Sequence, residues 1–173
     1  LDEEYLKVDC QLGGTDQRKI MVLAREMLPK LGYKSRIEIM NPLIPGLIGE
    51  KMSSSDEKSK IDLMDCPESI AKKMICAECV AGNADNGIMA FLKYILMTIK
   101  KDQKEKFVVK RDAKFGGDIS YSNYEDIEKD FVNKKLHPLD LKNAVAKEIA
   151  KLLEPIAKEK EALEKIAKLA YSK

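Results

Sequence analysis

The chain has 173 residues, of which 45% are hydrophobic and 35% are charged. This length suits one ordinary domain or two small ones, and the apolar content argues against a disordered protein. No apolar run approaches the roughly 20 residues of a membrane-spanning helix, and the acidic start, Leu1-Asp2-Glu3-Glu4, is unlike a signal peptide. We therefore expect a cytoplasmic protein without a membrane partner. We also expect a fragment, because the structured pattern begins with no Met or polar tail.

The first 40 residues predict an α/β arrangement. Gly13-Gly14 precede an amphipathic helix that ends near Leu31, where Gly32 supplies the stop. Its apolar positions follow the helical i, i+3, i+4, i+7 spacing: Ile20, Leu23, Ala24, Met27, Leu28 and Leu31. The polar and apolar alternation of residues 36–40 predicts a short strand after this helix.

A long loop rich in Pro, Gly and Ser follows, from Asn41 to about Lys60. Loops of this length inside a compact region are usually functional or disordered. We expect it to close a first domain at residues 1–60, with a second, helical domain at residues 61–173.

Four helix starts are expected in the second domain, at Asp65–Glu68, Gly87, Ser122–Glu125 and His137–Pro138. Ser122–Glu125 has the pattern of a capping box. Pro155 must kink or break the last helix, because proline removes a backbone donor. Residues 107–109 are expected to be extended, and residues 115–118 to form a turn.

The four cysteines are expected to be reduced, and Cys76 and Cys79 to be ordinary buried thiols. Cys76-x-x-Cys79 has the spacing of half a zinc site, but no second pair follows and His137 is far away in sequence. Without a secretory signal, reduced thiols are favoured over a disulfide framework. We expect no metal ligands in the chain.

The C-terminal part of the chain is mildly basic. Residues 93–173 hold 19 Lys and Arg against 14 Asp and Glu, a net charge of +5. Such a surface fits a polyanionic partner. On charge alone, a solvated helical surface is the favoured explanation.

The strongest chemical signal is Lys51-Met52-Ser53-Ser54-Ser55. A cationic Lys on a loop rich in Gly and Ser suits a polyphosphate, because the ammonium, the hydroxyls and the backbone N–H groups all favour negative charge. Chemistry alone leaves open a plain polar surface loop. The string resembles the signature loop of class I aminoacyl-tRNA synthetases, in the form of the archaeal and eukaryotic tyrosine enzymes. Bacterial relatives carry a second Lys where Ser54 stands.

This resemblance implies catalytic roles for Lys51, Ser53 and Ser54, with Lys51 stabilising the pyrophosphate leaving group. Lys51 and Met52 are also expected to bind ATP.

Gly13-Gly14-Thr15-Asp16-Gln17 is a second candidate site. Paired glycines let the backbone approach a ligand closely, and Asp16 in the first helical turn favours sugar hydroxyls over phosphate. A simple glycine turn is the alternative. By resemblance to the tyrosine enzymes, Gly14 and Asp16 contact the adenylate ribose and Gln17 contacts tyrosine. The same resemblance implies that Asp2 accepts a hydrogen bond from the substrate phenol.

Two further segments resemble the anticodon-reading parts of archaeal tyrosine enzymes. Residues 111–118 place Phe115 among basic residues beside two glycines, which suits a platform for an unstacked base, although a packed core Phe is the commoner case. The resemblance implies that Phe115 stacks on the first anticodon base and that Asp140 accepts from the Watson–Crick edge of that guanine. Asp140 could instead merely favour its helix N-terminus. For His137, RNA contact and helix capping remain equally open.

The resemblance covers nearly the whole chain. It implies the C-terminal part of a Rossmann-type nucleotide-binding domain followed by an all-α anticodon-binding domain. It also implies a tyrosine–tRNA ligase that uses ATP, Mg²⁺, L-tyrosine and tRNA and forms a homodimer through an upstream segment. The chain lacks the HIGH-type motif of such enzymes, so we expect the isolated 173 residues not to aminoacylate.

Two alternatives remain open from the sequence. One is a non-catalytic RNA-binding module derived from a synthetase, against which the intact Lys51, Asp16 and Gln17 argue. The other is the related tryptophan enzyme, although Asp2 with Gln17, and the pair of Phe115 and Asp140, favour tyrosine.

Overall fold

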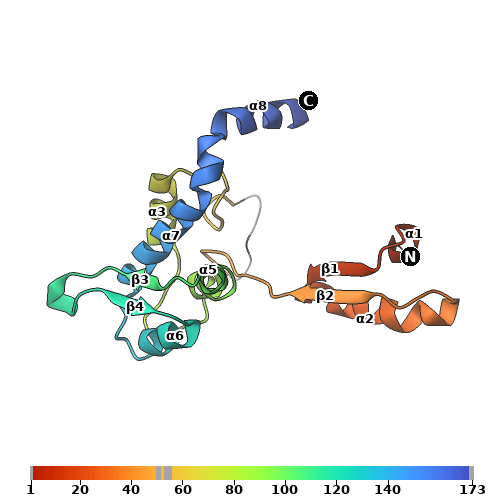
Figure 1. Cartoon of the computed structure of the whole chain (residues 1–173), viewed down its shortest axis with the longest axis horizontal. Coiled ribbons are helices and arrows are strands. Elements are labelled where there is room, and N and C mark those ends of the chain that lie inside the picture. The colour runs from red at the N-terminus through yellow and green to blue at the C-terminus, as the bar shows by residue number, and fades with distance from the viewer. Residues whose placement is uncertain (1, 50–51, 53–55, 172–173) are drawn as a thin grey trace. The chain divides into compact units, whose positions relative to one another are not determined.

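The computed structural model describes residues 2–49, 52 and 56–171, and the chain folds as two compact units, Leu1–Leu43 and Ile44–Lys173 (Figure 1). Each unit has its own elements and is described by itself.

The first unit is a small β–α–β arrangement. Its elements are α1 (Asp2–Tyr5), β1 (Cys10–Gly14), the short η1 turn (Thr15–Gln17), α2 (Arg18–Met27), η2 (Pro29–Leu31) and β2 (Ile37–Asn41). β1 and β2 pair in parallel, with Cys10 opposite Ile37 and Gly14 opposite Asn41. Parallel neighbours need a crossover connection, and α2 supplies it. The expected helix and second strand are confirmed.

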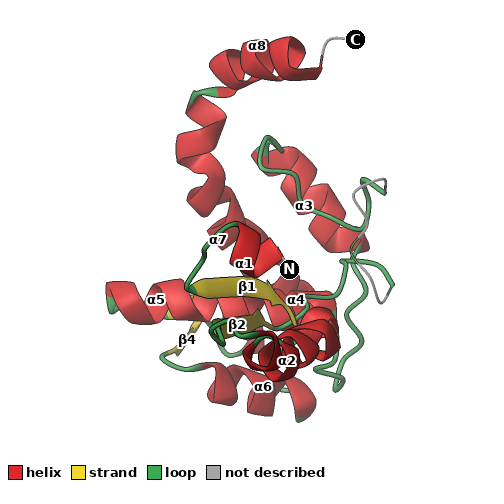
Figure 2. Ribbon diagram, turned by 90° about the vertical axis from the view of Figure 1, so that its right-hand side faces the viewer, coloured by secondary structure: helices red, strands yellow, loops and turns green. Residues whose placement is uncertain are grey.

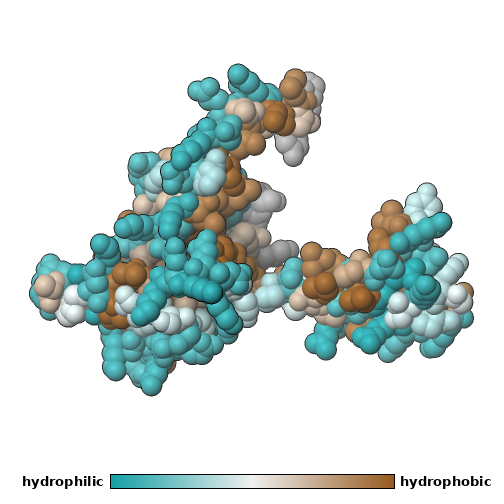
Figure 3. Space-filling model, viewed as in Figure 1, coloured by the Kyte–Doolittle hydropathy of each residue, from teal (hydrophilic) through white to brown (hydrophobic). Residues whose placement is uncertain are grey.

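The apolar stripe expected along α2 lies mostly at the surface of this unit. Ile20 and Leu23 are 64% and 59% exposed, whereas Met21 and Leu28 are buried. Figure 3 displays apolar side chains on the surface of this unit. A sheet of two strands covers only a narrow part of a helix, so the remainder of the stripe stays open.

The second unit is mainly helical but contains a small sheet. Its elements are α3 (Pro67–Cys76), α4 (Gly87–Phe91), the π-helical turn η3 (Leu92–Leu96), α5 (Met97–Gln103), β3 (Phe107–Val109), η4 (Ala113–Phe115), β4 (Ile119–Tyr121), α6 (Tyr124–Val132), α7 (Pro138–Lys158) and α8 (Lys160–Tyr171). β3 and β4 are antiparallel, with Phe107 opposite Tyr121. The expectation of an all-α second part is therefore wrong for this unit.

The two units divide earlier in the chain than residue 60, where the sequence places the domain boundary. The difference arises because the start of the long loop packs on the second unit. Leu47 is buried in its core, and its N–H donates to the Ser59 carbonyl at 2.9 Å. The Leu47 carbonyl accepts from the Glu78 N–H at 2.7 Å.

Several helix ends follow the sequence, and others differ in register. α3 begins at Pro67, as expected. α6 is capped by Asn123, whose Oδ1 accepts from the Asp126 N–H at 2.9 Å, so the expected box at Ser122–Glu125 is wrong by one residue. α7 continues through Pro155, and the break follows at Glu159 (Figure 2).

The core of the second unit joins α3 to α7 and α7 to β3. Lys142 on α7 strengthens the first contact, because its Nζ donates to the carbonyls of Ile75 and Ala77 at 2.9 and 2.7 Å. These carbonyls close the C-terminal end of α3, where a cation is favourable.

Phe107→Ala is expected to destabilise this unit by about 3–5 kcal/mol, because it deletes a large side chain from a filled core. Phe107 is fully buried, whereas its strand neighbour Val108 is 38% exposed. Val108→Ala is the matched control and should cost no more than ~1 kcal/mol. Urea unfolding of both variants measures the difference, and equal losses would contradict this assignment of the core.

Candidate functional site

The three residues expected to read the anticodon line one pocket of the second unit. Phe115, His137 and Asp140 surround a cavity of about 470 Å³, together with Arg111, Lys134, Lys135 and Leu139. Phe115 comes from the turn between β3 and β4, and the other two come from the start of α7. The chain thus brings together residues that are more than 20 positions apart in sequence.

Phe115 is a surface side chain with 63% of its area exposed, which decides against a packed core Phe. It ends the short η4 turn, where the Asp112 carboxylate accepts from the Lys114 N–H at 3.0 Å. Gly116 and Gly117 follow with φ of 93° and 73°, which side chains rarely tolerate. The backbone therefore presents the ring on a tight turn.

His137 and Asp140 are held by the first turn of α7. His137 caps the helix, because its Nδ1 accepts from the Leu139 N–H at 3.1 Å. This leaves Nε2 as the ring nitrogen open to a ligand. Asp140 is half-buried in that turn, and no hydrogen bond or ion pair of its carboxylate occurs within the described residues. Its lone pairs are available to a donor in the pocket.

The pocket wall is otherwise cationic. Arg111, Lys134 and Lys135 contribute three positive charges against the single carboxylate of Asp140. Such a balance attracts a phosphate backbone, while one unpaired acceptor can select a base edge that carries N–H donors.

Tyr121 and Asp130 form the support beneath this wall. The Tyr121 hydroxyl donates to Asp130 Oδ2 at 3.1 Å. Burial first, and the Asp130 bond second, raise the pKa of Tyr121 to about 12, so the hydroxyl remains a donor at neutral pH. The Asp130 carbonyl in turn accepts from the N–H groups of Lys135 and Leu136 at 2.9 and 3.2 Å.

The expected ribose and tyrosine contacts lie in the first unit. Gly14 ends β1, and Asp16 and Gln17 follow in η1, where Gln17 Nε2 donates to Asp16 Oδ2 at 3.1 Å. A Cβ on Gly14 would collide with the Asp16 carboxylate, so a larger residue there would force that side chain to move. Ligands of open α/β sheets bind beyond the carboxyl ends of parallel strands, where these residues lie. Asp2 is exposed in α1, and no hydrogen bond or ion pair joins it to the motif in the part of the chain that is described.

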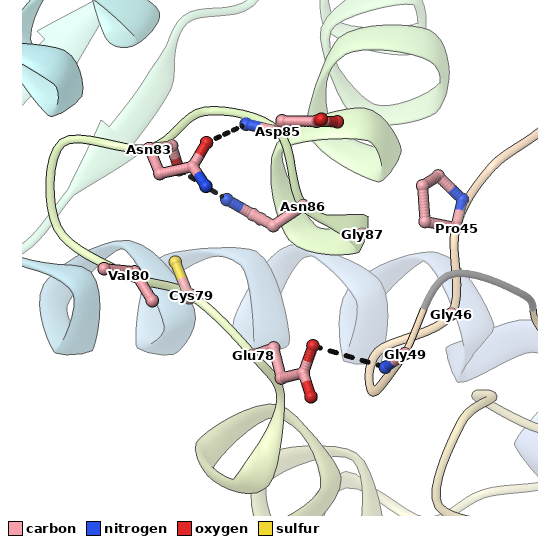
Figure 4. A pocket seen from close by; sticks show the side chains of 10 residues that line it. All are labelled: Pro45, Gly46, Gly49, Glu78, Cys79, Val80, Asn83, Asp85, Asn86 and Gly87. Atoms are coloured by element: carbon pink, nitrogen blue, oxygen red, sulfur yellow. Dashed lines mark hydrogen bonds between the residues drawn. The ribbon is translucent and has the colours of Figure 1, made fainter.

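Lys51, Ser53 and Ser54 lie outside the described residues, and Met52, which is described, is 41% exposed. The segment that leads into the signature loop is well held, however. The Gly49 N–H donates to Glu78 Oε2 at 3.3 Å, beside a cavity of about 450 Å³ (Figure 4).

A second close contact holds the same segment. A Cβ on Gly87 would collide with the Gly46 carbonyl, so α4 begins directly against the chain there. Sequence reasoning missed the roles of Glu78 and Gly87, because both depend on contacts with residues about 30 to 40 positions away in the chain.

The cysteines are all free thiols. Cys10, Cys66 and Cys76 are exposed, so the expectation of a buried thiol is wrong for Cys76. Cys79 is half-buried, and burial raises its pKa. No group of three or more His, Cys, Asp or Glu that could hold a metal ion occurs among the described residues. None of the described helices is long and apolar enough to cross a membrane.

With both sites in view, comparison with known proteins gives the class. The family of class I tRNA synthetases for tryptophan and tyrosine matches residues 1–154. The chain belongs to this family.

Its similarity within the family is to the tyrosine enzymes. It is 51% identical, over 99% of its length, to the cytoplasmic tyrosine–tRNA ligase of Danio rerio. The tyrosyl-tRNA synthetases of Archaeoglobus fulgidus and Pyrococcus horikoshii, both solved with L-tyrosine, are 46% and 34% identical. Their TM-scores are 0.81 and 0.87, over 92% and 99% of this chain.

The chain spans only part of these relatives. It covers 32% of the Danio rerio protein, 48% of the Archaeoglobus structure and 53% of the Pyrococcus structure. Its helix-rich fold with two small sheets corresponds to part of a synthetase.

Proposed function

We propose that this chain belongs to a working tyrosine–tRNA ligase, to which it contributes the RNA-reading pocket and part of the nucleotide site. The observation that supports this most strongly is the pocket in which an exposed Phe115 lies beside three cationic side chains and Asp140, whose carboxylate has no partner among the described residues. Stacking, one acceptor and positive charge are what reading a single unpaired guanine requires.

The finer division of the fold is part of the same proposal. Residues 1–60 would be the end of a Rossmann-type catalytic domain, consistent with the parallel pair of β1 and β2 joined by α2. Residues 61–173 would be the anticodon-binding domain, with its small β3–β4 sheet presenting Phe115. Because the Danio rerio relative is named cytoplasmic, we propose the same compartment.

The proposed reaction has two steps. The tyrosine carboxylate attacks the α-phosphate of ATP, which gives tyrosyl-adenylate and releases pyrophosphate. The terminal ribose hydroxyl of tRNA then attacks the carbonyl carbon of the adenylate, which forms the tyrosyl ester and releases AMP. Gly14 and Asp16 would hold the adenylate ribose, and Asp2 and Gln17 would contact tyrosine. Lys51 would neutralise charge that develops on pyrophosphate, aided by Met52, Ser53 and Ser54 of its loop. Positioning and electrostatic stabilisation carry such a reaction without a protein nucleophile.

Magnesium accompanies ATP in this proposal as a partner of the phosphates. The described residues do not form a cluster that would hold the ion. We therefore derive no step from a metal bound by this chain. The homodimer expected through an upstream segment likewise remains a proposal.

The proposal is tested by charging tRNA with radiolabelled amino acid, using the full-length natural protein. Tyrosine should be transferred to tyrosine tRNA in a reaction that requires ATP. RNA binding without any transfer would instead support the non-catalytic RNA-binding module. Transfer of tryptophan would support the tryptophan enzyme.

Phe115→Ala is expected to weaken tRNA binding by about 10-fold, because stacking of a base on an aromatic ring contributes roughly 1–3 kcal/mol. Tyrosine-dependent ATP–pyrophosphate exchange should keep its wild-type rate, since no tRNA takes part in that step. Phe115→Trp, which preserves a stacking surface, is the matched control and should retain binding. Loss of exchange in Phe115→Ala would mean that this residue is structural.

A further inference from the structure

Two segments of the second unit form the RNA-reading pocket, and nothing in the covalent chain fixes their separation. Residues 111–118 carry Phe115, and residues 134–140 carry His137 and Asp140. A base that stacks on the ring and donates to the carboxylate must meet both at once. Reading therefore depends on whatever holds the two segments together.

Arg111 contacts both segments with one guanidinium group. Its Nε donates to the Gly117 carbonyl at 3.0 Å, and its Nη1 donates to the Lys135 carbonyl at 3.3 Å. Its backbone N–H also donates to Asp118 Oδ1 at 3.0 Å. Within the described residues, the bond to Lys135 is the hydrogen bond that joins the two segments directly.

The hydrogen bonds of Arg111 hold backbone segments that contain residues in the left-handed region. Gly116 and Gly117 both have positive φ, and a Cβ on Gly116 would lie 3.4 Å from Arg111 Nη2. Lys134, which precedes the bonded Lys135 carbonyl, is also in the left-handed region with φ of 59°. Residues other than glycine are disfavoured in the left-handed region, so contacts with the surrounding chain must hold Lys134 in that conformation.

Loss of Arg111 should leave the two segments that line the pocket folded. The Asp130 carbonyl accepts from the N–H groups of Lys135 and Leu136, and the Asp130 side chain accepts from the Tyr121 hydroxyl. None of these hydrogen bonds involves Arg111. Asp112 keeps its cap on η4, and His137 keeps its cap on α7. The turn that carries Phe115 would relax relative to Asp140, while each segment keeps its own local structure.

We propose that Arg111 is a positioning residue for base selection, because its two carbonyl bonds set the separation between Phe115 and Asp140. The proposal rests on the RNA-reading role given to this pocket. A planar guanidinium can donate in two fixed directions, whereas a Lys ammonium acts as a compact point charge. The function assigned to Arg111 therefore needs its fork shape as well as its charge.

The test compares two short RNA hairpins that carry the anticodon loop of a tyrosine tRNA, with guanine or adenine as the first anticodon base. Binding is measured for the full-length natural protein and for Arg111→Lys, Arg111→Gln and Lys110→Gln. Lys110 is an exposed neighbour of Arg111. Its replacement removes one charge but none of the hydrogen bonds that Arg111 donates to carbonyls. The wild type should prefer guanine by about 10-fold or more, as one well-placed base contact provides.

Both Arg111 variants should reduce this preference by at least about 5-fold, and Lys110→Gln should leave it unchanged. Urea unfolding with a wild-type midpoint in the same preparations shows that the variants are folded, and ATP–pyrophosphate exchange at the wild-type rate shows that activation is unaffected. A preference retained by Arg111→Lys would overturn the positioning role, because charge alone would then suffice. An unchanged preference in Arg111→Gln would also overturn it, while leaving the RNA-reading proposal intact. No guanine preference in the wild type would reject both.

Discussion

Lys51→Ala should slow formation of tyrosyl-adenylate by about 10²–10³-fold, with little change in tRNA binding. The expected size follows from losing one preorganised positive group at the point where charge develops on the leaving pyrophosphate. The rate is measured by single-turnover adenylate formation with tyrosine and ATP in the full-length natural protein. Because the proposed interaction is made mainly in the transition state, the rate constant should fall more than the affinity for ATP.

Lys58→Ala provides the matched control for this experiment. Lys58 is an exposed lysine seven positions further along the chain, so its removal changes the net charge equally. It should leave the rate within about 2-fold, as expected for a surface substitution away from a binding site. Similar losses in both variants would indicate a general electrostatic effect and contradict the specific role of Lys51.

Asp140→Ala should have the second largest effect. It should reduce the charging efficiency (kcat/KM) with tyrosine tRNA by about 10–100-fold through a higher KM for the tRNA. The carboxylate has no partner within the described residues, so a guanine edge would be its hydrogen-bond donor. Without that acceptor, the buried N–H donors of the base would be left unsatisfied. Adenylate formation should be unaffected.

Glu125→Ala separates this role from an effect on helix stability. Glu125 is an exposed acid in the first turn of α6. Asp140 holds the corresponding place in the first turn of α7, where it is half-buried. Removing either carboxylate weakens the interaction with a helix dipole by about 0.3–1 kcal/mol. Only Asp140→Ala should also impair charging. If both variants charge tRNA equally well, Asp140 merely stabilises its helix.

The features that the sequence predicts well are local ones. The helix after Gly14, the start of α3 at Pro67 and the start of α7 at His137–Pro138 follow from residues next to one another in the chain. The pairing of β1 with β2 was missed because Gly13-Gly14 disfavours a strand, and only the partner strand stabilises it. The position of Leu47 in the second core likewise depends on contacts with Ser59 and Glu78.

The candidate site divides in the same way. Phe115, His137 and Asp140 were found because each lies in a short recognisable motif, and the structure adds that they share one pocket. Arg111 was present in its motif, but its bond to Lys135 joins positions 24 residues apart. Hydrogen bonds of this kind depend on how the segments pack, so no local pattern reports them.

Tyrosine-dependent ATP–pyrophosphate exchange by the full-length natural protein tests the central claim most directly. It isolates amino-acid activation from RNA recognition and asks for the amino acid at the same time. We predict rapid exchange with tyrosine and none above background with tryptophan. Exchange with tryptophan, or none with either amino acid, would contradict the assignment as a tyrosine–tRNA ligase.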